Sequence, residues 1–230
     1  MFLAGRSMAG RREQQKRDRE RRILCAAAHL FGTKGYAETA MEDVAVRARL
    51  AVGTLYNYFR SKSELLLAIL RRETEQLLAA GQPQVDDPSE DPTDAIAGVI
   101  DAYLDVFAHH DRKLWRDLFA AAIAEPSAIG AAAFRADLRL IGQLTSLLEK
   151  LRERGGLGAH VEPGRAAITL YSVYIVWFAV FLVDEGVTIE RLREEVRRGI
   201  EIGVCGLLPI SAQERSPDAR VSETQQGGAR

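Results

Sequence analysis

Thr39-Ala-Met-Glu-Asp-Val-Ala-Val-Arg-Ala-Arg-Leu-Ala-Val-Gly-Thr-Leu-Tyr-Asn-Tyr-Phe59 decides the fold, because this stretch predicts two short helices separated by a tight turn. Thr39 is a favourable N-cap and Glu42 follows three residues later, so a capping box predicts that the first helix begins near Ala40. In the second helix, Leu55 and Phe59 point inward at an i, i+4 spacing. The polar and aromatic residues between them are left to face outward. This pattern is typical of a helix-turn-helix that reads a DNA groove.

The flanking residues predict one helix before this stretch and one after it. The earlier helix has an apolar stripe at helical spacing, made of Ile23, Ala26, Ala27, Leu30 and Phe31. Gly35 is placed to end that helix in a left-handed cap. Ser61 and Glu64 form a second capping box, which opens the helix that leads away from the helix-turn-helix.

Two quoted motifs support a family resemblance. Gly53-Thr-Leu-Tyr-Asn-Tyr-Phe-Arg-Ser-Lys-Ser-Glu-Leu-Leu67, preceded by Ala27-Ala-His-Leu-Phe-Gly-Thr-Lys-Gly-Tyr36, resembles the N-terminal domain of the tetracycline-repressor (TetR) family of transcriptional regulators. The resemblance covers residues 21–67, about a fifth of the chain. It implies an all-α protein, with an N-terminal three-helix DNA-binding domain and an all-helical C-terminal domain for ligand binding and dimerisation.

The chain also departs from the usual family pattern around the turn. Arg49 stands where a turn glycine is common, Ala51 where Ser or Thr often caps the recognition helix, and Val52 where a polar or basic residue is frequent. An alanine cap gives up about 0.5–2 kcal/mol of local helix stability. We therefore expect a recognition helix that becomes firmer on DNA.

Eight residues are candidates for DNA contacts, because they combine hydroxyl, amide or cationic groups with a position on or beside the second helix. They are Thr39, Arg47, Arg49, Thr54, Tyr56, Asn57, Tyr58 and Lys62. The resemblance implies that Tyr58 and Lys62 contact phosphates. Two alternatives stay open: Tyr58 can pack against Phe59 instead, and the Asn57 side chain can lie along solvent. The basic stretch of residues 11–22 can thread a minor groove or merely concentrate charge.

The distribution of charge favours a polyanion at one end of the chain. Residues 1–62 contain 13 Lys and Arg against 6 Asp and Glu, whereas the whole chain has 31 against 32. The net charge is therefore +7 in the first part and −8 in the remainder. Such an asymmetry is expected when one end binds nucleic acid.

Composition limits the other functions. With 230 residues and 47% apolar content, the chain can bury a substantial core. Cys25 and Cys205 lie in apolar helical patterns, so we expect buried, reduced thiols in a cytoplasmic protein. No phosphate loop, nucleophile elbow or metal-ligand spacing is present in the sequence, and adjacent His109 and His110 would point about 100° apart on a helix. We therefore expect no enzyme activity, cofactor or metal.

The second half predicts amphipathic helices. The resemblance implies a ligand pocket among these helices, and pockets between helices commonly take largely apolar small molecules. Seven large aromatic residues are available to line such a pocket, although each is more often a core residue: Tyr103, Phe107, Trp115, Phe119, Tyr171, Tyr174 and Trp177. A further apolar stripe contains Phe134, Leu138 and Ile141. We expect an acidic loop over residues 81–92, rich in Pro, Asp and Ser.

Residues 166–183 carry no charge over 18 positions, which meets the lower limit for a membrane span. Thr169, Ser172 and two tyrosines interrupt the middle of this segment, and Asp184 and Glu185 flank it, so we prefer a buried helix and no membrane association. Residues 163–208 are predicted to form a homodimer as a four-helix interface, with a monomeric core as the alternative.

Together these observations predict four parts and one function. The parts are a disordered basic arm (1–18), a DNA-binding domain (19–64), a ligand-binding and dimerisation domain (65–210) and a disordered tail (211–230). The expected function is a homodimeric repressor that releases a palindromic double-stranded DNA operator when its effector binds. An activator of the same family, a protein that spans a membrane at 166–183 and a plain helical interaction module are the alternatives.

Overall fold

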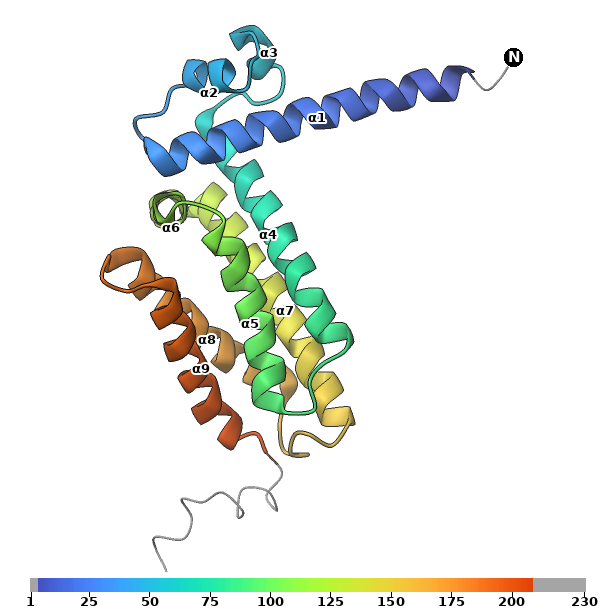
Figure 1. Ribbon diagram of the computed structural model, residues 1–230, viewed down its shortest axis with the longest axis vertical. Helices are drawn as coiled ribbons and strands as arrows, with labels where there is room; N and C mark the ends of the chain where they lie inside the picture. The colour runs from blue at the N-terminus through green and yellow to red at the C-terminus, as the bar shows by residue number, and fades with distance from the viewer. Residues whose placement is uncertain (1–3, 209–230) are drawn as a thin grey trace, which may run out of the picture. The chain divides into compact units, whose positions relative to one another are not determined.

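The computed structural model describes residues 4–208, which form helices joined by turns and short connections, with no strand among those residues (Figure 1). The all-α fold class is therefore confirmed. The helices are α1 (Ala4–Thr33), α2 (Met41–Arg47), α3 (Val52–Tyr56), α4 (Lys62–Asp86), α5 (Pro92–Ala108), α6 (Arg112–Ala124), α7 (Ala131–Glu153), α8 (Pro163–Val183) and α9 (Ile189–Cys205), and a short π-helical turn, Pro126–Gly130, lies between α6 and α7.

The described residues divide into two compact units. The first unit contains residues 4–77 and 105–138, and the second contains residues 78–104 and 139–208. The boundary predicted between residues 64 and 65 falls inside α4, which continues without a break from Lys62 to Asp86. The functional division of the chain into DNA-binding and ligand-binding domains stays a prediction.

The first correction concerns the basic arm expected over residues 1–18. Residues 4–18 are the beginning of α1, which has 30 residues in all. Arg, Gln, Glu and Lys are good helix formers, and no proline interrupts them. Gln14 donates a hydrogen bond to Asp18 at 3.2 Å, and Arg21 pairs with Asp18 at 3.5 Å. These local pairs support a helix where a high charge suggested disorder. The tail predicted over 211–230 lies outside the described residues.

The core of the first unit confirms the apolar stripe predicted for α1. Ile23, Ala27 and Phe31 are completely buried. Gly35 adopts a φ of 102°, as expected for a left-handed cap, and its amide donates to the carbonyl of Leu30 at 3.2 Å. α1 packs against both α2 and α6. The helix-turn-helix is therefore built on the C-terminal half of α1.

The start of α2 differs from the predicted capping box. The Thr39 side chain is buried, and its hydroxyl donates to the carbonyl of Gly35 at 2.7 Å. The N-cap is Ala40, whose amide donates to the Asp43 carboxylate at 3.1 Å. Asp43 replaces Glu42 because it is the residue three positions after the true cap. The hydrogen bond from Lys34, followed by that from Ala40, lowers the pKa of Asp43.

The second capping box is confirmed at the start of α4. Ser61 Oγ accepts a hydrogen bond from the amide of Glu64 at 3.2 Å, and the Glu64 carboxylate accepts one from the amide of Arg60 at 2.6 Å. The loop predicted over 81–92 is wrong for its first half, because α4 continues to Asp86. A Cβ on Gly81 would lie 2.7 Å from Gln143 Oε1, so this glycine serves close packing within a helix.

The second unit has a core of leucines and aromatic residues with one buried polar cluster. Tyr103 is fully buried and donates to Gln143 Oε1 at 2.6 Å. Gln143 Nε2 in turn donates to the carbonyl of Leu78 at 2.8 Å and to Gln82 Oε1 at 2.9 Å. Tyr174 from α8 packs edge-on against Tyr103, with the ring centroids 6.4 Å apart. This cluster joins residues of α4, α5, α7 and α8 within the unit.

Helix α8 is long and apolar enough to span a membrane by composition, but 44% of its most apolar window is buried inside the protein. Its buried side chains include Leu170, Tyr174 and Phe178. The helix packs against α9, which begins after the Thr188 N-cap. Thr188 Oγ1 accepts from the amide of Arg191 at 3.2 Å. The arrangement is that of a core helix.

Two further expectations are corrected. Cys25 and Cys205, which were expected to be buried, are both exposed, because at about 100° per residue their positions face away from the buried stripes of α1 and α9. Phe134 and Leu138 were expected to face a core, yet 62% and 49% of their surfaces are exposed. The buried stripe of α7 begins at Leu140 and continues through Leu151.

Candidate nucleic-acid interface

Helix α3 has only five residues and is held by its apolar side. Leu55 is completely buried and Phe59 is nearly so, which confirms their predicted inward orientation. Tyr56 is 44% exposed and Asn57 is exposed, whereas Thr54 is half-buried. The helix therefore presents a short polar and aromatic face to solvent. These side chains have the donors and acceptors that base edges require.

The turn before α3 is strained at one residue. Arg49 has a φ of 56°, in the left-handed region that favours glycine. This is the position where the family pattern usually has a turn glycine. A non-glycine residue costs about 1–2 kcal/mol in this region. Despite this strain, the chain has an arginine at this position, which places a cation just before α3.

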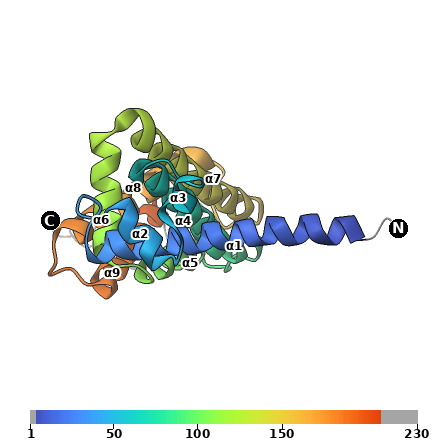
Figure 2. The same ribbon diagram turned by 90° about the horizontal axis from the view of Figure 1, so that it is seen from above.

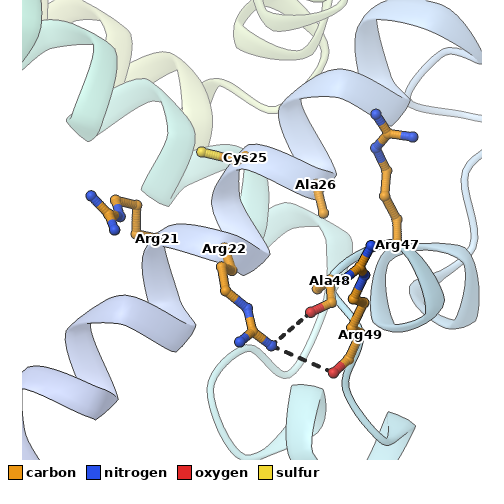
Figure 3. Close-up of a pocket in the computed structure, with 7 residues that line it drawn as sticks. All are labelled: Arg21, Arg22, Cys25, Ala26, Arg47, Ala48 and Arg49. Carbon is orange, nitrogen blue, oxygen red and sulfur yellow. Dashed lines mark hydrogen bonds between the residues drawn. The ribbon is translucent and has the colours of Figure 1, made fainter.

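Four arginines gather around this turn. A concavity of about 540 Å³ is lined by Arg21, Arg22, Cys25, Ala26, Arg47, Ala48 and Arg49 (Figure 3). Arg22 Nη2 donates to the carbonyl of Ala48 at 2.8 Å and to that of Arg49 at 3.4 Å. These hydrogen bonds fix the turn against α1. Among residues 4–208, no carboxylate lines the concavity, so its chemistry suits a phosphate group.

Arg47 and Arg49 were candidates from the sequence, and the structure brings them together. Arg21 and Arg22 were not named individually as site residues. The signal that would have identified them is the helical register of α1, because a continuous helix places positions near residue 22 beside Ala26 and the turn. The expectation of a disordered arm concealed this register.

Lys62 is held at the start of α4 by the connection between α1 and α2. Its ammonium donates to the carbonyls of Tyr36 and Ala37, both at 2.9 Å, and lies 5.0 Å from the centroid of the Tyr36 ring. An ammonium has three N–H donors, so one is left for a phosphate. Tyr36 is itself fixed, because its amide donates to Asp117 Oδ2 at 2.7 Å. Lys62 therefore has a structural role in addition to its predicted one.

Two of the remaining DNA candidates have different surroundings. Thr39 is 1% exposed and its hydroxyl is occupied within the protein, so a DNA contact from this side chain is excluded in this structure. Because Thr39 is polar and precedes a helix, it was predicted to be an exposed N-cap. Tyr58 is half-buried beside the buried Phe59, which suits a phenol that packs on one side and faces solvent on the other. Its predicted phosphate contact stays a prediction.

The seven aromatic residues predicted to line a ligand pocket divide between the units. Phe107 and Trp115 are buried against each other in the first unit, with ring centroids 4.4 Å apart, and Trp115 Nε1 donates to the carbonyl of Phe107 at 3.2 Å. Phe119 in the same unit is 40% exposed. The others belong to the second unit, where Tyr103, Tyr171 and Tyr174 are buried and Trp177 is half-buried. Their role as a ligand pocket stays a prediction.

A second, smaller concavity of the first unit has a volume of about 160 Å³ and lies between α1 and the segment that joins α5 to α6. Its lining includes Cys25, His29, Arg72 and His110. None of the seven aromatic residues lines either concavity. Over residues 4–208, no group of three His, Cys, Asp or Glu residues is placed to hold a metal ion.

Comparison with protein families supports the interpretation of the first unit. Residues 23–69 match the model of the N-terminal domain of a family described as bacterial regulatory proteins, tetR family. The chain is 32% identical over 102 residues to the HTH-type transcriptional activator FasR of Mycolicibacterium smegmatis, covering 44% of this chain and 46% of FasR. It is 45% identical over 67 residues to the HTH-type transcriptional repressor KstR of Rhodococcus jostii, covering 29% of this chain and 32% of KstR. The matches thus span less than half the length of these relatives.

Solved structures resemble the chain over most of its length. A TetR-family regulator from Mesorhizobium loti has a TM-score of 0.67 at 20% identity, with 82% of this chain and 96% of that chain covered. Thermus thermophilus FadR, a TetR-family repressor solved in complex with lauroyl-CoA, has a TM-score of 0.63 at 24% identity, with 82% and 95% covered. At this level of identity the likeness establishes the fold.

Proposed function

Because the chain belongs to the tetR family of bacterial regulatory proteins, we propose that it is a DNA-binding transcriptional regulator that holds a palindromic operator as a homodimer. The observation that carries this proposal is the exposed face of α3 beside the four-arginine concavity. Tyr56 and Asn57 offer groups for base edges, and Arg47 and Arg49 offer charge for phosphates. One short surface thus combines the two kinds of contact that specific binding needs.

Repression released by a small molecule is the mode of action that we favour. KstR is named a repressor, and FadR is a repressor solved with lauroyl-CoA. In our proposal, a largely apolar effector binds among the aromatic residues of the C-terminal helices. It acts by favouring a separation of the two recognition helices that no longer fits both half-sites. Such an effector shifts the equilibrium only by its difference in affinity between the two states.

Activation is the second candidate, and one observation favours it. FasR matches 102 residues of this chain and is named a transcriptional activator. The DNA-binding surface is the same in both modes, because the sign of regulation depends on where the operator lies relative to the promoter. In either mode the protein works where bacterial DNA lies, in the cytoplasm.

The homodimer is proposed to form through residues 163–208. Ile168, Val176, Val180 and Val183 are 38–79% exposed, and at about 100° per residue they fall within an arc of about 120° on α8. Ile202 on α9 is 77% exposed. Two such helices from each copy would bury this surface in a four-helix interface. A two-fold dimer then places its recognition helices about 34–36 Å apart, one DNA turn.

Selection of DNA fragments from a bacterial genome tests the DNA-binding role. We expect the purified chain to enrich a palindrome. Asn57→Ala should relax the sequence preference at one position of each half-site, whereas Arg47→Ala should weaken binding to all sequences about equally. Failure of the parent protein to enrich any sequence would favour a helical interaction module and contradict the proposal.

Sedimentation of interface variants tests the dimer. Val176→Asp combined with Val183→Asp places charges in the proposed interface and should yield a monomer that binds the palindrome weakly. Ile123→Asp is the matched control, because Ile123 is 71% exposed on α6, outside residues 163–208. A dimer that survives the α8 substitutions would place the interface elsewhere.

A further inference from the structure

Helix α1 carries a stripe of polar and cationic side chains on one face. Arg12, Gln15, Arg19 and Arg22 follow one another at intervals of three, four and three residues, and all four are exposed. At about 100° per residue, these intervals place the four side chains on one side of the helix. We call this set the arginine stripe. It begins at the helix-turn-helix and continues into the part of α1 that was expected to be disordered.

Arg22 fixes the direction in which the arginine stripe faces. Its guanidinium donates to the carbonyls of Ala48 and Arg49, in the turn between α2 and α3. Arg19, Gln15 and Arg12 lie on the same face toward the N-terminus, so they face the side on which that turn lies. Figures 1 and 2 both show this part of α1 projecting past α2 and α3. The stripe therefore continues the cationic surface of the four-arginine concavity.

The two sides of α1 differ in charge. Arg17 lies about 180° from the centre of the arginine stripe, and Glu13, Glu20 and Arg21 share its side, where two carboxylates offset two guanidinium groups. Asp18 lies at the flank, where its carboxylate is paired with Arg21 and Gln14. The four stripe positions carry no carboxylate. Positive charge is thus concentrated on the side of the recognition helix.

We propose that the arginine stripe binds the phosphate backbone of duplex DNA next to the half-site that α3 reads, a role that rests on the proposed function. Arg12 and Arg22 are ten residues apart, which is about 15 Å along a helix. Duplex DNA presents about one charge per 1.7 Å of its axis, so several phosphates lie within this length. The stripe extends the contact by about four base pairs beyond the half-site, at about 3.4 Å per base pair.

A lipid surface is the less suitable partner for this helix. A helix that lies in a membrane interface needs an apolar face opposite its cationic face. Opposite the arginine stripe, α1 has the charged residues Glu13, Arg17, Glu20 and Arg21, whereas its apolar residues at 23, 27 and 31 are buried in the first unit. The charge pattern therefore favours a polyanion that is recognised along one side only.

The test compares the full-length protein with three variants on the palindrome that the parent enriches. Arg12→Gln combined with Arg19→Gln removes two charges from the stripe, and the corresponding pair of lysine substitutions retains them. Arg17→Gln is the control on the opposite side of α1. Gln and Lys have helix propensities close to that of Arg, so the helix content should be unchanged by circular dichroism. Arg22 is left intact because it supports the turn.

The glutamine pair removes four charges from a dimer on its palindrome, so we expect it to lower the slope of log affinity against log salt concentration by about four. This variant should then lose roughly a hundredfold less affinity than the parent between 50 and 200 mM salt. Its hydroxyl-radical footprint should be about four base pairs shorter in each half-site, whereas the lysine pair and Arg17→Gln should keep the footprint of the parent. If the glutamine pair keeps the slope and footprint of the parent, the arginine stripe does not bind DNA, and the proposed function is unaffected. If Arg17→Gln lowers the slope as much per charge removed as the glutamine pair does, DNA binding does not depend on the face of α1 that carries the stripe. A parent that enriches no sequence would overturn the proposed function itself.

Discussion

Helices α3 and α8 use their residues in opposite ways. α3 has five residues and buries Leu55, whereas α8 has 21 residues and buries nine of them. Most of α3 is therefore available for contact with a partner, and it depends on a single anchor for its position. The nine buried residues of α8 commit one side of that helix to the core of the second unit, and its proposed partner surface is the exposed apolar arc. The exposed residues of α3 and the buried residues of α8 can therefore be changed separately, the former to test partner binding and the latter to test stability.

The largest expected effect lies in α8. Phe178 is 5% exposed and stacks on Tyr174 and Phe181, with ring centroids 5.8 and 6.2 Å apart. Phe178→Ala should lower the free energy of unfolding by about 3–5 kcal/mol, because it removes a large buried side chain and leaves a cavity. Urea denaturation followed by circular dichroism measures this loss. A change of less than about 1 kcal/mol would contradict a core role for this face of α8.

The single anchor of α3 should have the next largest effect. Leu55→Ala should destabilise the first unit by about 2–5 kcal/mol, since the side chain is completely buried. DNA binding should fall with it, because the exposed residues of α3 lose their fixed orientation. Tyr56→Ala is the matched comparison: it should reduce DNA binding with a stability change within about 0.5 kcal/mol. If both variants unfold alike, α3 is not the exposed reader that we describe.

The buried hydrogen bond between Tyr103 and Gln143 tests how much polar contacts contribute to the stability of the second unit. Tyr103→Phe leaves Gln143 Oε1 without its donor and should cost about 1–3 kcal/mol. Burial raises the pKa of Tyr103 in the folded state, whereas a tyrosine in the unfolded chain has a pKa of about 10. The folded state therefore keeps the neutral form, so its stability is fully present below about pH 10 and decreases as the pH rises further. Unfolding curves measured from pH 8 to 11 should show a smaller decrease for Tyr103→Phe than for the parent.

The smallest expected effect separates stability from binding at the turn before α3. Arg49→Gly removes the strain of a positive φ but adds freedom to the unfolded chain, so the net gain in stability should be about 1 kcal/mol or less. The same substitution removes one cation from each protomer of the proposed dimer and should lower the salt slope of DNA binding by about two. Thermal unfolding and binding titrations should therefore change in opposite directions. Weaker DNA binding accompanied by a lower melting temperature would contradict this separation.

The sequence predicted the helix-turn-helix well because its signals are local. The inward positions of Leu55 and Phe59, the cap at Gly35 and the Ser61–Glu64 pair each depend on neighbours within one or two turns. Thr39 shows the limit of such signals. A threonine before a helix can cap that helix or donate to a carbonyl of the preceding turn. In this structure the Thr39 hydroxyl donates to the carbonyl of Gly35.

The remaining errors arise from contacts that are distant in sequence or from charge alone. Residues 81–86 were assigned to a loop because they belong to a stretch, 81–92, that is rich in Pro, Asp and Ser, but α4 continues to Asp86 and Gly81 packs against Gln143. Residues 4–18 were assigned to an arm from their charge, although their propensity favours a helix. The position of the predicted aromatic pocket depends entirely on such long-range packing, so its residues could be named from the sequence but not placed.

In the proposed function, Lys62 would link DNA binding to the local folding of its neighbours. Its ammonium reaches the surface from a seat made by the carbonyls of Tyr36 and Ala37. If an operator phosphate takes the remaining donor as proposed, it would hold the ammonium against those carbonyls, so a bound operator should slow hydrogen exchange of the amides around Tyr36. Protection of these amides would then be greatest in the DNA complex and would decrease when the operator dissociates.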